Sequence, residues 1–353
     1  MEFQLPIQIP SLPSPIRYGD KILLTGSCFT EHIGNQLHDW KFDTLQNPHG
    51  IVFDPASVAS GLVSYIEDRR YTAGDLVFFN ELWQSWQHHS VFSGTDRGEV
   101  LDRINRSQAR AHSFLREARW LIITLGTSFS YRLSGSFSGL LPGEAAYSES
   151  GREHRPAYPV ANCHRAPAQA FTKHLMSIEE IHSVLDNCLH RLFSFNPAIE
   201  VIFTISPVRH IRDGVVENNR SKARLIESVH HLVNKFDRIW YFPAYELVVD
   251  VLRDYRFYDL DMVHPNYQAT HFVLDKFTRH FIDGSSQQLV EEIKKIVIAR
   301  RHRALHPDTL AHKRFLEDYR RKTGEIAARY PMLDFREELA WFAGEAGEHE
   351  SGG

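Results

Sequence analysis

The sequence predicts a three-layer α/β/α fold with a parallel sheet, followed by additional C-terminal helices. Three observations support this prediction. Short apolar runs alternate along the chain with segments whose apolar residues recur at helical spacing. Two of the runs, 120–126 and 200–206, are continuously apolar and rich in β-branched residues, as is typical of parallel strands buried on both faces. Segments with polar and nucleophilic residues directly follow several of these runs. In a parallel sheet, the loops that follow the strands lie together at its carboxyl edge.

The elements are expected in a regular order. A buried strand at 22–24 passes through Gly26 into a helix at 31–40, and Asp54 and Pro55 have the N-cap and first-turn chemistry of a second helix. An aromatic-rich stretch at 71–87 predicts a hairpin or meander, and 131–153 an inserted loop or hairpin. The remaining strands are predicted at 42–45, 120–126, 200–206 and 238–242, and the remaining helices at 99–118, 177–195, 218–236, 245–252 and 267–281.

The chain divides by composition into three parts. Residues 1–284 are assigned to the α/β domain. Residues 285–336 form a helical C-terminal extension, with charged helices at 288–302 and 310–329, and residues 337–353 form an acidic tail that is expected to be disordered.

The bulk composition excludes several classes of function. The chain has 353 residues and a net charge of −4, which gives no electrostatic reason to bind nucleic acid or an anionic membrane surface. No stretch is long and apolar enough to span a bilayer, and residues 1–20 lack the pattern of a secretory signal. Three cysteines make no disulfide framework and suit a reducing compartment. We therefore expect a cytoplasmic protein.

The segment Gly26-Ser27-Cys28 places two nucleophiles where a strand turns into a helix. A side chain there lies at the edge of the sheet, near the positive end of a helix, and this field favours a thiolate or an oxyanion. The alternative is an ordinary strand–turn–helix connection with a buried cysteine.

Asp261 and His264 form the second candidate pair. A carboxylate three residues before a histidine, on a loop that precedes a helix, can fix the imidazole tautomer and stabilise its cation, so that the other ring nitrogen acts as a base. The alternative is a capping aspartate beside a surface histidine. The pair gains weight from its position in the last loop of a domain whose first loop carries Cys28.

The order of these segments resembles the SGNH (GDSL-type) hydrolase superfamily, and Gly26-Ser-Cys-Phe29 resembles more narrowly the bacterial GSCFA-domain family. Supporting segments are Asn47-Pro-His-Gly50, Trp86–Ser90, Thr124–Thr127, Val160–His164, Ser206–His210, Asp254–Tyr258 and Asp261–Pro265. They cover most of residues 20–280 but not the C-terminal helices. The resemblance implies a flavodoxin-like fold and a Ser–His–Asp style site for ester hydrolysis or acyl transfer, with His264 and Asp261 as the base and its orienting carboxylate.

Two departures from the superfamily pattern bear on the site. Overlaid on Gly-Asp-Ser-Leu, this chain has Cys28 at the nucleophile position and Ser27 in place of the aspartate; a shifted frame makes Ser27 the nucleophile. The Gly-x-Asn block reads Gly126-Thr-Ser, so the oxyanion-hole asparagine is absent. Gly50, Gly126 and the backbone around Cys28 are candidate oxyanion donors, with Asn162 or His164 as substitutes for the amide. Loss of one such donor costs about 10²–10³ in rate.

Weaker candidates remain around this site. His88 and His89 either line the cleft or pack within the aromatic meander. Arg209 and His210 follow a buried strand and either bind a carboxylate or phosphate of the substrate or belong to a solvated loop. Asn218, Arg220 and Lys222 open a helix and could hold an anion there.

Three hypotheses for function follow. The leading one is an esterase or deacetylase that forms a covalent acyl-enzyme on a small-molecule or carbohydrate ester, without a cofactor, or an O-acyltransferase with the same site. A metal-dependent hydrolase is suggested by the 21 histidines, but metal-ligand spacing is missing. The third is a catalytically inert ligand-binding module on the same fold. The sequence leaves the oligomeric state open.

Overall fold

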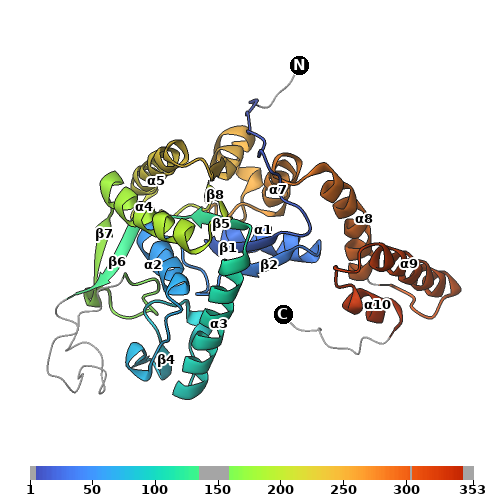
Figure 1. Cartoon of the computed structure of the whole chain (residues 1–353), viewed down its shortest axis with the longest axis horizontal. Coiled ribbons are helices and arrows are strands. Elements are labelled where there is room, and N and C mark those ends of the chain that lie inside the picture. The colour runs from blue at the N-terminus through green and yellow to red at the C-terminus, as the bar shows by residue number, and fades with distance from the viewer. Residues whose placement is uncertain (1–4, 135–158, 303, 345–353) are drawn as a thin grey trace.

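The central sheet has five parallel strands in the order β2-β1-β5-β8-β9. The computed structural model describes residues 5–134, 159–302 and 304–344 (Figure 1). The five strands predicted from the apolar runs are all formed. Their bounds are β1 Lys21–Gly26, β2 Asp43–Gln46, β5 Trp120–Leu125, β8 Glu200–Ile205 and β9 Ile239–Phe242.

Helices cover both faces of this sheet, because alternate strand residues are apolar on both sides. Leu121 and Ile123 belong to one core cluster, and Trp120 and Ile122 belong to the other. The first face is covered by α2 Pro55–Ile66, α3 Arg97–Glu117, α4 Ile178–Phe195 and α5 Val215–Lys235. The second is covered by α1 Cys28–Asp39, by α6 Ala244–Glu246 with the π-helical turn Leu247–Leu252, and by α7 Tyr267–Phe281. The predicted three-layer α/β/α fold is confirmed.

In the described ranges, two small two-stranded antiparallel sheets lie outside the central sheet. The hairpin expected in the aromatic-rich stretch is formed by β3 Val77–Phe79 and β4 Leu82–Gln84. A second pairs β6 Phe129–Leu133 with β7 Phe171–Leu175, a strand that the sequence did not predict. Most of the insertion expected at 131–153 lies outside the described residues.

The C-terminal extension contains three helices, which extend from one side of the α/β domain (Figure 1). They are α8 Gly284–Arg301, α9 Leu310–Arg329 and α10 Arg336–Phe342. The last helix lies in the segment expected to be a disordered tail, so that boundary was wrong. Phe335 and Phe342 are buried against α8 and α9, which offsets the acidic composition that suggested disorder.

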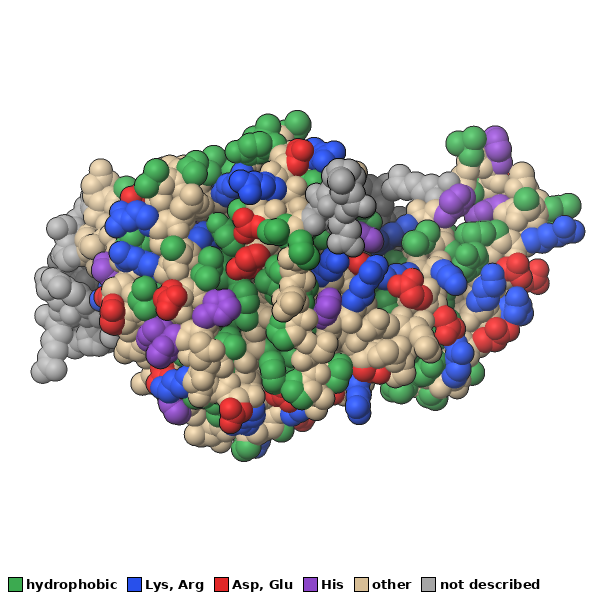
Figure 2. Space-filling view, turned by 90° about the horizontal axis from the view of Figure 1, so that it is seen from above, with side chains coloured by type: hydrophobic (Ala, Val, Ile, Leu, Met, Phe, Trp, Pro, Cys, Tyr) green, Lys and Arg blue, Asp and Glu red, His purple; other side chains and the backbone are tan. Residues whose placement is uncertain are grey.

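The surface shown in Figure 2 mixes charges of both signs. Acidic and basic side chains are interspersed over that face rather than gathered by sign, in line with the small net charge. In the described ranges, no helix combines the length and the apolar character that a membrane crossing requires.

Candidate functional site

The turn after β1 is fixed by backbone geometry that only glycine adopts easily. Gly26 has a φ of 145°, and a Cβ atom there would overlap the carbonyl oxygen of Thr124 on the neighbouring strand. The Gly26 N–H donates to the Asn47 side-chain oxygen at 2.9 Å, and the Ser27 N–H donates to Thr124 O at 3.1 Å. The start of α1 is therefore tied to both neighbours of β1.

Ser27 and Cys28 have different roles in this turn. Ser27 is the N-cap of α1, only 3% exposed, and its Oγ accepts a hydrogen bond from the Phe29 N–H. Cys28 is the first residue of the helix and is partly exposed. The Ser27 hydroxyl is buried and engaged, whereas Cys28 is partly exposed and its thiol has no such capping role, which favours Cys28 as the nucleophile.

The environment of Cys28 does not lower its pKa as the helix N-terminus suggested. Burial raises the pKa of the Cys28 thiol, and Glu31 on the same helix raises it further. The backbone N–H groups of Phe29 and Cys28 and the ammonium of Lys222 act in the opposite direction. Burial affects the pKa of Cys28 more strongly than the helix N-terminus does. Cys28 is therefore mostly in the thiol form at neutral pH.

Asp261 and His264 form the predicted pair. Nδ1 of His264 lies 2.6 Å from Oδ2 of Asp261, while Oδ1 accepts from the N–H groups of Val263 at 2.9 Å and His264 at 3.0 Å. These backbone and imidazole donors lower the pKa of Asp261 to about 2. Both side chains are about half exposed. The carboxylate thus stays charged and fixes the ring, leaving Nε2 for proton transfer.

Arg209 supports the loop that carries this pair. Its guanidinium lies 4.3 Å from the ring centroid of Tyr258 and donates to the carbonyl oxygen of Met262 at 3.3 Å. Its backbone N–H donates to Val263 O at 3.3 Å. Arg209 therefore contacts the Asp261–His264 loop itself, in addition to any role in binding an anionic substrate.

His210 lies between this loop and the sheet edge. Its ring stacks on Phe53 with centroids 5.0 Å apart, and its Nε2 lies 3.2 Å from the place that a Cβ on Gly126 would occupy. That nitrogen is buried and has no hydrogen-bond partner in the described part of the chain. Burial, Lys222 and His264 together lower the pKa of His210 to about 4, so the ring is neutral at pH 7.

The structure thus brings four groups to one edge of the sheet: Cys28, Lys222, His210 and His264. Cys28 and Lys222 act on each other's pKa, and Lys222 and His264 both lower the pKa of His210. Within the described residues, Cys28 and His264 form no direct hydrogen bond. The sequence did not predict the buried position of Lys222 at this edge. Lys222 was instead expected to bind an anion at the start of its helix.

Two of the predicted oxyanion donors are engaged elsewhere. The Gly50 N–H donates to Asn47 O at 2.7 Å, and the Gly126 N–H donates to Phe53 O at 2.8 Å. Asn162 uses its side-chain oxygen to accept from the His164 N–H at 2.8 Å. By contrast, the buried side-chain NH₂ of Asn47 has no partner among the described residues. Asn47 is thus a candidate donor that lay within a quoted motif but was not singled out.

The histidines of the meander form a packed cluster. His49 and His88 stack with centroids 4.2 Å apart, and His49 contacts the hydroxyls of Tyr65 and, at 3.2 Å, Tyr71. Burial lowers the pKa of His49 to about 3 and that of His88 well below its usual value. These two neutral rings belong to the packing rather than to an open cleft.

His164 and His89 lie at the border of this cluster. The His164 Nε2 contacts Ser85 O at 2.8 Å, and its Nδ1 is buried without a partner in the described ranges. His89 is half-buried, packs beside Gly50 and accepts from the Val91 N–H through Nδ1. Over the part of the chain that the structure describes, no three His, Cys, Asp or Glu side chains gather as a metal site would require.

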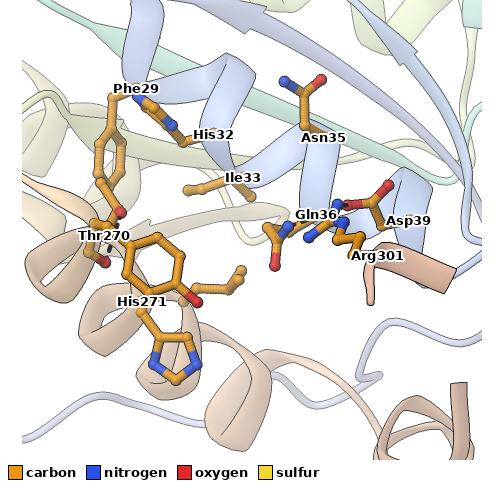
Figure 3. A pocket seen from close by; sticks show the side chains of 11 residues that line it. Phe29, His32, Ile33, Asn35, Gln36, Asp39, Thr270, His271 and Arg301 are labelled. Atoms are coloured by element: carbon orange, nitrogen blue, oxygen red, sulfur yellow. Dashed lines mark hydrogen bonds and ion pairs between the residues drawn. The ribbon is translucent and has the colours of Figure 1, made fainter. Parts of the chain in front are cut away.

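A groove of about 270 Å³ lies between α1 and α7 (Figure 3). Helix α1 carries Cys28 at its first position, one turn before His32 in the groove wall, and α7 begins three residues after His264. The groove therefore runs beside the candidate site. Its wall mixes apolar side chains, Phe29, Ile33, Tyr267 and Leu274, with polar ones, His32, Asn35, Gln36, Asp39, Thr270, His271 and Arg301.

The fold and site define an α/β protein with a partly exposed thiol at the first strand–helix turn and an Asp–His pair in the last loop. The sequence model of the GSCFA family matches residues 21–277. The chain therefore belongs to the GSCFA family. A second model, of the C-terminal domain of GSCFA domain proteins, matches residues 293–345. A search among curated proteins found no similar sequence.

Proposed function

We propose that this protein is an acyl-transfer enzyme, an esterase or deacetylase that works through a thioester on Cys28. The observation that carries the proposal is a histidine held 2.6 Å from a carboxylate, on the last loop of a domain whose first strand–helix turn carries the partly exposed Cys28. The parallel sheet and the position of the Asp–His pair before the last helix of the α/β domain support the wider resemblance to SGNH hydrolases.

The proposed reaction begins when Sγ of Cys28 attacks the ester carbonyl carbon, and the thiol proton passes to Nε2 of His264. The carbon–oxygen bond of the ester then breaks, and His264 returns the proton to the departing alcohol. Asp261 keeps the imidazole oriented and stabilises its cation. Water activated by His264 then hydrolyses the thioester and releases the acid. An unpaired amide, such as that of Asn47, is available to stabilise the oxyanion.

The groove supports an ester with a hydroxyl-bearing alcohol portion. Its wall offers amide, imidazole and hydroxyl groups that can bind the hydroxyls of a sugar or polyol, and the apolar side chains of Phe29, Ile33 and Leu274 can pack against the less polar face of such a group. The same feature favours the second candidate function, transfer of the acyl group to a sugar hydroxyl in place of water. Mass analysis of the products with and without an added polyol distinguishes hydrolysis from transfer.

The test of covalent catalysis is a brief incubation with an activated acetyl ester, an acid quench and peptide mapping by mass spectrometry. Wild type is compared with Cys28→Ala, Ser27→Ala and His264→Ala. We expect acetyl on Cys28 in the wild type and in Ser27→Ala, none in Cys28→Ala, and a fall of about 10²–10⁴-fold in the acylation rate of His264→Ala. Absence of any His264-dependent adduct would instead favour the inert binding module.

A further inference from the structure

Lys222 is a buried lysine that forms no ion pair with an acidic side chain in the described part of the chain. It lies in the second turn of α5 and is 1% exposed. Its Nζ donates to Gly126 O and to Ser206 O, both at 2.6 Å. Burial of an ammonium without an anionic partner is costly even when carbonyl oxygens accept its protons. A neighbouring group that becomes negatively charged when it ionises would therefore stabilise the Lys222 ammonium.

The two carbonyl groups place this ammonium at the carboxyl edge of the sheet. Gly126 and Ser206 directly follow β5 and β8, and β1 is the other neighbour of β5. Adjacent strands lie about 4.8 Å apart, so the Lys222 ammonium is within one or two strand spacings of the turn that carries Cys28. In agreement with this, burial lowers the pKa of Lys222 to about 7 and Cys28 acts against that shift, while burial raises the pKa of Cys28 and Lys222 acts against that one.

The other groups near Lys222 are neutral or cationic at pH 7. Burial and Lys222 hold His210 in its neutral form, and the Tyr245 ring, whose centroid lies 5.9 Å from Nζ, has a phenol whose pKa burial raises. His264, on the loop before α7, also faces His210. Glu31 is the one nearby carboxylate that acts on Cys28, and it disfavours the thiolate. Among the residues that the structure describes, no acidic side chain therefore pairs with this ammonium in place of Cys28.

We propose that Lys222 is the built-in counter-ion of the Cys28 thiolate. When the S–H bond of Cys28 breaks, the proton goes to solvent in the free protein or to Nε2 of His264 in the proposed reaction, and in both cases the thiolate remains beside the protonated Lys222. The ion pair opposes part of the effect of burial on Cys28, and it stabilises the negative charge that develops on Sγ as the proton leaves. Lys222 acts here as a positioning residue. Its use in catalysis rests on the proposed function, but the ion pair itself does not.

The test is the pH profile of Cys28 alkylation by iodoacetamide, followed at the Cys28 peptide by mass spectrometry. We compare wild type with Lys222→Met, Lys222→Arg and Lys235→Met, a control at the exposed end of the same helix. Lys222→Met is expected to lower the alkylation rate at pH 7 about tenfold or more and to move the midpoint to higher pH. Lys222→Arg keeps part of the effect, and Lys235→Met none. An unchanged midpoint in folded Lys222→Met overturns the proposal.

A reciprocal measurement covers the case in which Lys222→Met does not fold. The protein is labelled with ¹³C at lysine Cε, and Lys222 is titrated by NMR in wild type and in Cys28→Ala. Removal of the thiolate is expected to lower the titration midpoint of Lys222, and an identical midpoint in both proteins refutes the ion pair. Neither assay needs an ester. A shifted alkylation profile without an acetyl adduct thus establishes the pair while refuting the proposed reaction.

Discussion

The neutral, buried His49 should make the stability of this protein sensitive to mild acid. His49 is enclosed by Tyr65, Tyr71 and the stacked ring of His88, and burial lowers its pKa from 6.5 in the free side chain to about 3. At pH 5 the unfolded chain therefore binds a proton that the native state does not. Stability that is complete above pH 6.5 is lost as the pH falls toward 3.

The two pKa values set the size of this effect. Between pH 7.5 and pH 5, a shift from 6.5 to about 3 removes about 2 kcal/mol of the free energy of unfolding. His88, whose pKa is also lowered, adds to the slope in the same direction. The replacement His49→Gln removes the titrating group while keeping an amide that can bond to Tyr65.

Urea unfolding at several pH values checks the prediction. We expect His49→Gln to be less stable than wild type at pH 7.5 because it disturbs the packed cluster, and to lose about 2 kcal/mol less than wild type on going to pH 5. His38→Gln, at an exposed position near the end of α1, should lose as much stability as wild type between pH 7.5 and pH 5. If His49→Gln also loses as much stability as wild type between these pH values, the native ring is protonated or accessible at pH 5, and the prediction is refuted.

Three further changes test other parts of the structure. Ser27→Ala removes the N-cap of α1 and should lower the free energy of unfolding by about 1 kcal/mol in urea; wild-type stability would mean that the cap is dispensable. Glu338→Gln removes the buried charge that pairs with Lys41 at 2.8 Å and should lower stability by about 3 kcal/mol, whereas a change under about 0.5 kcal/mol would show that the ion pair does not hold α10. Gly50→Ala adds a Cβ that overlaps His89 at a φ of 75° and should lower the melting temperature, which differential scanning calorimetry would detect.

The central sheet was predictable because it depends on short-range pattern. Continuous apolar runs identify β5 and β8, and Gly26 before Cys28 marks the turn into α1. The Asp261–His264 bond follows from a spacing of three residues on one loop. These features are local, so the amino-acid sequence alone is sufficient to predict them.

The features that the sequence did not predict depend on contacts between residues that are distant along the chain. Lys222 has the same helical spacing as the buried Leu225 and Val229, a signal that it points inward. Its acceptors, however, follow two different strands, and one of them is 96 residues away along the chain. Glu338 made its segment resemble a solvated acidic tail, although Lys41 balances its charge. The engagement of the Gly50 N–H likewise depends on turn geometry that the sequence does not specify.

The contacts of the C-terminal helices give the extension a mechanical relation to the candidate nucleophile. Arg301 of α8 pairs with Asp39 at the last position of α1, and the Lys294 ammonium lies 4.7 Å from the Trp40 ring centroid just beyond it. A twelve-residue helix is a stiff rod of about 18 Å, with Cys28 at its other end. The C-terminal extension is therefore anchored to the end of α1 opposite Cys28, and loss of these two contacts would free that end of the helix.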